Sequence, residues 1–118
     1  MYVKGLFDLR QKVQNHFGSR ALYRATQRYD PGVSENGNVK FLLYDSFVVG
    51  FGIMEPPLTS LAFFLMAPGD VTTTRLLGKK LVFIENREQD VEDAFRVVDE
   101  YCRLRLPDTF LQVYDALE

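Results

Sequence analysis

With 118 residues, of which 47% are hydrophobic and 25% charged, the chain has the balance of an ordinary globular protein, and this excludes an intrinsically disordered one. The length gives room for one hydrophobic core, so we expect residues 1–118 to form a single domain. The formal net charge of −2 disfavours a dedicated nucleic-acid-binding domain, which is usually strongly basic.

The composition also predicts a cytoplasmic protein. The single cysteine, Cys102, cannot form an internal disulfide, which favours a reducing compartment. Residues 1–10 contain no uninterrupted apolar stretch of the kind found in signal peptides. The longest apolar run, Leu61–Ala67, is much shorter than the ~20 residues that a membrane-spanning helix needs. We therefore expect no membrane association.

A helix is predicted near the N-terminus, because apolar residues recur there at the three- and four-residue intervals that line one side of a helix. These residues are Leu6, Leu9, Val13 and Phe17. Gly18 is expected to end or kink this helix, and Ser19 to cap a second helix that continues to Arg28.

On that second helix, three arginines at four-residue intervals would form one basic ridge beside an aromatic ring. The candidate partner-binding residues are therefore Arg20, Tyr23, Arg24 and Arg28. Three interpretations stay open: pairing with acidic residues of the same fold or plain solvation, contact with an acidic protein, and contact with nucleic acid. The overall acidity of the chain disfavours the last of these.

A β-hairpin is predicted next, from Val39–Tyr44 and Phe47–Met54 with Asp45-Ser46 as the tight turn. Within the second strand Gly50 and Gly52 point to the same face and leave it partly bare. Such bare positions suit either the close approach of a helix or a ligand pocket. A phosphate loop is rejected, because the third glycine and the following helix are missing.

The segment Leu58–Ala67 fits a buried strand and a buried helix almost equally well, and we favour the strand. If it were helical, the chain would form three layers. Two further strands, Val71–Leu77 and Lys80–Ile84, are predicted to join across Gly78-Lys79.

Two helices are predicted to close the chain. Asn86 and Gln89 resemble a capping box at the start of a helix that runs to about Arg105, and Pro107 opens a last helix. The apolar side of that last helix is predicted to be Phe110, Val113, Tyr114 and Leu117. The fold class is therefore α+β, with an N-terminal helix, an antiparallel sheet of four or five strands and two C-terminal helices packed on the sheet.

No catalytic residue is predicted. The only histidine, His16, lies on the first helix, whereas Cys102 lies within the apolar stripe of another, so no nucleophile is placed beside a base. The spacing of potential ligands matches no zinc or calcium site, and we expect no metal and no cofactor. Whether the protein is an enzyme stays open, with the balance against it.

The charge is unevenly distributed, with six basic and two acidic side chains in residues 1–30 and four basic and nine acidic in residues 86–118. The leading hypothesis is a non-catalytic protein-binding module, such as an inhibitor, an immunity-type protein or an adaptor, that acts through charged helix faces. The alternative is a small-molecule-binding or enzymatic fold of cone shape with a pocket between sheet and helices. The expected partner is a protein, and homodimer formation stays open.

Overall fold

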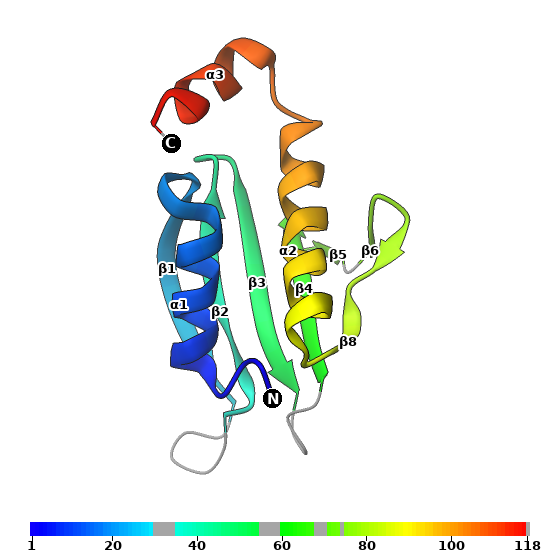
Figure 1. Cartoon of the computed structure of the whole chain (residues 1–118). Helices are drawn as coiled ribbons and strands as arrows, with labels where there is room; N and C mark the ends of the chain where they lie inside the picture. The colour runs from blue at the N-terminus through cyan, green and yellow to red at the C-terminus, as the bar shows by residue number, and fades with distance from the viewer. Residues whose placement is uncertain (30–34, 55–59, 68–70, 74, 118) are drawn as a thin grey trace.

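The structure is a computed structural model, and it describes residues 1–29, 35–54, 60–67, 71–73 and 75–117. Two long helices, α1 (Leu6–Phe17) and α2 (Glu88–Arg103), lie side by side on one face of an antiparallel sheet (Figure 1). This architecture confirms the predicted α+β class. No helix in the described ranges is both long and apolar enough to cross a membrane.

The first helix, α1 (Leu6–Phe17), buries the four apolar residues that its spacing predicted and ends where Gly18 adopts a φ of 59°. A short 3-10 helix, η1 (Gly18–Arg20), then turns the chain back. The helix expected over residues 19–28 is wrong, because this segment forms strand β1 (Ala21–Arg28). Pairing with the next strand, interrupted by one bulge between Tyr23 and Ala25, provides backbone hydrogen bonds that outweigh the modest helix preference of its arginines and alanines.

The main sheet is antiparallel throughout. Its central strands are β2 (Gly37–Leu43), β3 (Phe47–Met54) and β4 (Ser60–Ala67), with β1 at one edge. The other side of β4 is shared by β8 (Val82–Glu85), which pairs with one half, and β5 (Val71–Thr73), which pairs with the other. The strand favoured for residues 58–67 is therefore confirmed over 60–67, while 58 and 59 lie outside the described residues.

Two turns shape the sheet. The predicted β2–β3 hairpin is confirmed, and its turn holds Tyr44 and Asp45 at positive φ, with the Ser46 amide donating to the Leu43 carbonyl. The prediction of two long strands, Val71–Leu77 and Lys80–Ile84, is wrong in their lengths, because β5 and β8 are both shorter. A small separate hairpin, β6 (Arg75–Leu76) and β7 (Lys79–Lys80), divides them.

Helix α2 (Glu88–Arg103) follows β8, and its buried side faces the sheet. The capping box predicted at its start is wrong. The Asn86 side chain instead binds the backbone of Val3, accepting from its amide at 2.7 Å and donating to its carbonyl at 2.8 Å. These two bonds join the N-terminal segment to the start of α2. Together they satisfy both polar atoms of the Asn86 side chain.

Helix α3 (Asp108–Leu117) begins after Pro107 as predicted and lies across the end of the sheet near the β2–β3 turn (Figure 1). Its inner side is Leu111 and Tyr114, whereas Val113, predicted to be on the apolar side, is 61% exposed. The helix approaches a turn and not a flat sheet, so it buries a narrower stripe than its sequence suggests.

Aromatic rings fill the space between the sheet and the two long helices. The ring of Phe51 on β3 lies 4.8 Å from that of Phe63 on β4, and Phe63 stacks on Phe95 of α2 at 5.4 Å. Phe17 of α1 completes this cluster. All four side chains are fully buried, so this face of the sheet is closed by packing.

Candidate functional site

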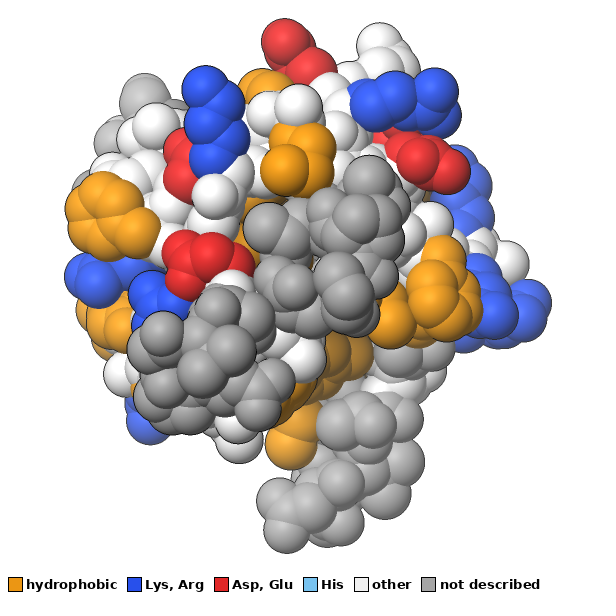
Figure 2. All heavy atoms as spheres, turned by 90° about the horizontal axis from the view of Figure 1, so that it is seen from below, with side chains coloured by type: hydrophobic (Ala, Val, Ile, Leu, Met, Phe, Trp, Pro, Cys, Tyr) orange, Lys and Arg blue, Asp and Glu red, His pale blue; other side chains and the backbone are white. Residues whose placement is uncertain are grey.

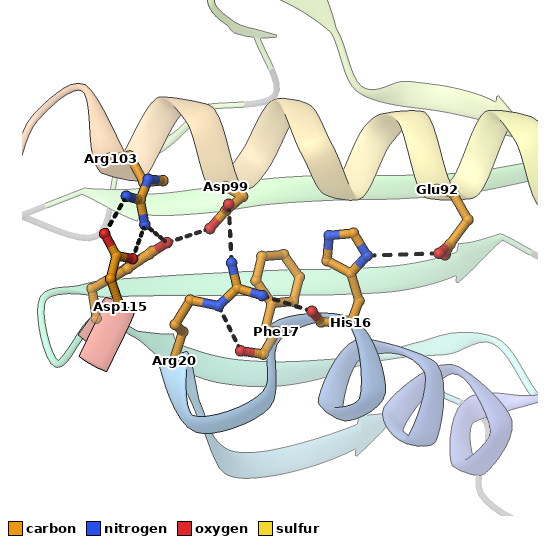
Figure 3. A network of polar contacts seen from close by, with 8 residues as sticks. His16, Phe17, Arg20, Glu92, Asp99, Arg103 and Asp115 are labelled. Atoms are coloured by element: carbon orange, nitrogen blue, oxygen red, sulfur yellow. Dashed lines mark hydrogen bonds and ion pairs between the residues drawn. The ribbon is translucent and has the colours of Figure 1, made fainter. Parts of the chain in front are cut away.

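Arg20 is a link between α1 and α2 (Figure 3). Its guanidinium donates to the backbone carbonyls of His16 and Phe17, each at 2.7 Å, and to the Asp99 carboxylate of α2 at 3.1 Å. It therefore satisfies carbonyls at the C-terminal end of α1, which the helix itself leaves without partners. Both ionic side chains are only 18% exposed, so this pair is screened less than a surface ion pair.

The same network continues to the β2–β3 turn and to α3 (Figure 3). The buried Tyr44 hydroxyl donates to Asp99 at 2.5 Å and accepts from Arg103 at 3.3 Å, and Arg103 also binds both oxygens of Asp115 at 3.0 Å. Burial, and then the hydrogen bond to Asp99, raise the pKa of Tyr44. The phenol therefore stays protonated at neutral pH, and the network is suited to holding elements together and not to nucleophilic chemistry.

The predicted partner-binding residues are spread along β1 and do not form one ridge. Arg20 precedes the strand and turns toward α2, whereas Arg28 ends it and pairs with Glu35. Tyr23 faces the core side, where its ring meets Phe41 at 5.7 Å, and Arg24 lies at a bulge between Tyr23 and Ala25. Their role in partner binding stays a prediction, without the helical geometry that suggested it.

Gly50 and Gly52 lie on the side of the sheet that faces away from α1 and α2. A Cβ on Gly50 would collide with the ring of Phe64, which packs across it from β4. A Cβ on Gly52 would lie 3.1 Å from the Ala62 carbonyl oxygen and 3.3 Å from that of Gly37. The close approach expected at these glycines therefore comes from neighbouring strands and not from a helix.

This outward face is unusually apolar for a sheet surface. Along β2, β3 and β4 its positions alternate with those that face the helices, and Lys40 is the charged residue among them, beside the polar Asn38 and Ser60. Leu22 of β1 is 56% exposed on the same face. The half-buried apolar side chains are Leu42, Val48, Met54, Ala62, Phe64 and Met66.

A hollow of about 380 Å³ opens at one end of this face, on the side of the sheet opposite the aromatic core. Gly52, Met54, Ala62 and Phe64 line it from β3 and β4, and Tyr29 lines it from beyond β1. Figure 2 views the molecule from this end and shows apolar side chains at the surface among basic and acidic ones. Apart from Gly52, the sequence patterns did not single out these residues. One signal could have found them: in β3 the apolar residues occupy both the odd and the even positions, so both faces of the strand are apolar.

Asn38 lies beside this hollow and is 2% exposed. It pairs with Gly52 across the ladder, and its Cβ lies 3.7 Å from where a Cβ on Gly52 would be. Its Nδ2 donates to the Tyr29 hydroxyl at 2.8 Å, with the Gln27 amide oxygen at 3.5 Å. In the part of the chain that the structure describes, its Oδ1 is buried and accepts no hydrogen bond.

Potential metal ligands and the Cys102 thiol are the remaining reactive groups of the described ranges. No group of three or more His, Cys, Asp or Glu side chains there is placed to hold a metal ion. Burial, with a smaller contribution from Asp99, raises the pKa of the Cys102 thiol to about 12, so the thiol stays protonated at neutral pH. Comparisons with protein-family models, with curated proteins and with solved structures give no match to this chain.

Proposed function

We propose that this chain is a non-catalytic protein-binding module and that the outward face of its sheet is the contact surface. The observation that carries the proposal is the apolar character of that face. An antiparallel sheet with one solvated side normally alternates apolar residues inside with polar residues outside. Here the outward positions of β2–β4 include the apolar Leu42, Val48, Met54, Phe64 and Met66, whereas Lys40 is the charged residue and Asn38 and Ser60 are the polar ones among them.

Contiguous apolar surface of this kind marks interaction sites in soluble proteins. The methionines support the assignment, because their flexible thioether side chains adapt to a partner's shape and are frequent in binding surfaces. The charged residues of the helices are partly engaged within the fold, as the Arg20–Asp99 and Arg103–Asp115 pairs illustrate. We therefore assign the binding surface to the sheet in preference to the charged helix faces.

The exposed edge of the sheet is less suited to binding. In the described residues β1 pairs with β2 alone, so its other side could in principle accept a further strand. However, a bulge interrupts its register between Tyr23 and Ala25, and the charged Arg24 lies there. Bulges and charges of this kind prevent the addition of strands at sheet edges. We therefore propose contact through the face.

The test compares partner capture by single variants that fold like the wild type. Val48→Glu places a carboxylate in the outward face, and Gln11→Glu is the control on the exposed side of α1. We expect a partner captured by the wild type and by Gln11→Glu to be lost from Val48→Glu. Thermal unfolding checks that both variants remain folded.

A third variant distinguishes the proposal from binding through charged helix faces. Glu100→Lys reverses an exposed charge on α2 without touching the sheet. If this variant loses the partner while Val48→Glu keeps it, the contact surface is the acidic helix and the proposal for the sheet face is wrong.

A further inference from the structure

The hollow beside Gly52 has a lining that suits a flat aromatic group. Gly52, which has no side chain, lines it together with Ala62, the rings of Phe64 and Tyr29 and the thioether of Met54. The lining also includes Asn36, Gly37 and Ile53. Backbone without a side chain allows a ring to approach closely, and aromatic and thioether groups are favourable neighbours for a ring. At about 380 Å³ the hollow lies in the size range of pockets for small ligands or single large side chains.

The buried amide of Asn38 adds a polar requirement. Both neighbours of its Nδ2, Gln27 and Tyr29, come from β1 or the residue after it. Oδ1 is buried and accepts no hydrogen bond within the described residues, and Gly52, the cross-strand partner of Asn38, lines the hollow. A buried acceptor without a donor is costly and is rare in folded proteins, so an incoming N–H or O–H group would gain a hydrogen bond that the protein alone does not make.

Resting on the proposed function, we infer that this hollow receives the side chain of a tryptophan or tyrosine from the partner protein, with its N–H or O–H directed at Asn38 Oδ1. Such side chains combine a large apolar body with one polar group, and they dominate the binding energy of many interfaces when they fill a pocket. Tyr29 is half exposed, lines the hollow and accepts a hydrogen bond from Asn38 Nδ2, so on this inference a shift of its side chain admits the donor.

The experiment uses indole as the probe, with 1-methylindole as the analogue that lacks the donor. The chain contains no tryptophan, so indole fluorescence excited at its red edge reports the probe alone. We expect indole to bind with a Kd on the order of 1 mM or tighter, as suits a fragment of this size. Amide resonances of Gly37 and Gly52 and the side-chain amide of Asn38 should shift on binding. No binding of indole, or shifts confined to other residues, would overturn the inference.

The donor is tested on the unaltered protein. If the N–H group meets the buried acceptor, 1-methylindole should bind about fivefold or more weakly than indole, the ratio expected from one neutral hydrogen bond. Equal affinity would show that Asn38 plays no part and would overturn the polar half of the inference.

A matched pair of variants tests the location. Ala62→Leu fills the hollow, and Ala25→Leu makes the same change on an exposed outward position away from the lining residues. We expect Ala62→Leu to weaken indole binding about tenfold or more, because the side chain occupies the volume of the probe. Ala25→Leu should leave the affinity unchanged. Equal weakening by both variants would contradict the assignment to this hollow.

The source of the ring is tested with N-acetyl-tryptophanamide, which carries the backbone groups of a residue within a chain. Binding as tight as that of indole supports a side chain of a partner, whereas exclusion of this probe would mean that the hollow takes a free small molecule. The two proposals fail separately. Loss of partner capture in Val48→Glu without any indole binding overturns the inference alone, and indole binding without that loss overturns the sheet-face function.

Discussion

The two faces of the sheet are built from the same strands but are closed to different degrees. On the face toward α1 and α2, Phe41, Phe51 and Phe63 are fully buried. On the opposite face Leu22 is 56% exposed, and Phe64 is only half-buried although it crosses Gly50. Alternation along a strand places apolar residues on both sides here, and only the position of the helices decides which side becomes core. In the described part of the chain no helix lies over the other side, and this is the side on which we propose that a partner binds.

The largest contrast is expected between two phenylalanines, one on each face. Phe51→Ala removes a ring that contacts Phe17, Phe41, Phe63 and Phe95, and it should cost about 3–5 kcal/mol of unfolding free energy. Phe64→Ala should cost about 1–2 kcal/mol, because its ring is already partly in water. Urea titration of both variants measures the difference. Equal losses would show that the outward face is as tightly packed as the core.

Arginines give the next contrast. Arg20→Ala removes two bonds to helix carbonyls and a partly buried ion pair, and should cost about 2 kcal/mol. Arg24→Ala, at the exposed bulge, should change stability by less than about 0.5 kcal/mol. Thermal unfolding compares them. A similar loss for both would mean that Arg24 has a stabilising contact comparable to that of Arg20.

Gly52, which lines the hollow, tests how closely β2 and β4 approach β3. Gly52→Val should destabilise the protein by about 1 kcal/mol or more, because even its Cβ would lie 3.1 Å from the Ala62 carbonyl oxygen and 3.3 Å from the Gly37 one. Gly52→Ala is the graded control and should cost less. An unchanged melting temperature in Gly52→Val would contradict the close approach of these strands.

The smallest effect concerns pH at the α3 end of the sheet. Burial, and then the hydrogen bond to Asp45, raise the pKa of Tyr114 from its ordinary value of 10.0 to about 12. The folded protein thus holds this proton more tightly than the unfolded chain does. Its stabilising contribution is complete below pH 10 and is lost as the pH rises toward 12.

Tyr114→Phe removes this group and should therefore flatten the fall in stability over that pH range, although Tyr44, whose pKa is also raised, still contributes. Unfolding titrations in urea at several alkaline pH values measure both slopes. Identical slopes for variant and wild type would show that Tyr114 titrates alike in the folded and unfolded states.

Local periodicity was sufficient for much of this fold. The apolar spacing from Leu6 to Phe17 specifies α1 and its buried side, and alternation specifies the β2–β3 hairpin. The stripe of α2 and the start of α3 after Pro107 also follow from the sequence. The patterns of α1, α2 and the β2–β3 hairpin succeed because one face of each of these elements is buried along its length, which leaves a repeat that can be counted.

The sequence by itself thus determined the α+β class and the long helices, while contacts between distant residues decided the rest, including the choice of strand over helix for residues 60–67. Residues 21–28 form a strand because β2 pairs with them on both sides of the bulge at Arg24. Asn86 does not cap α2, because its side chain binds the Val3 backbone through both of its polar atoms. For the candidate site, the sequence marked only Gly50 and Gly52. The hollow and the buried Asn38 arise where β1, β2, β3 and β4 meet, and no single segment carries their pattern.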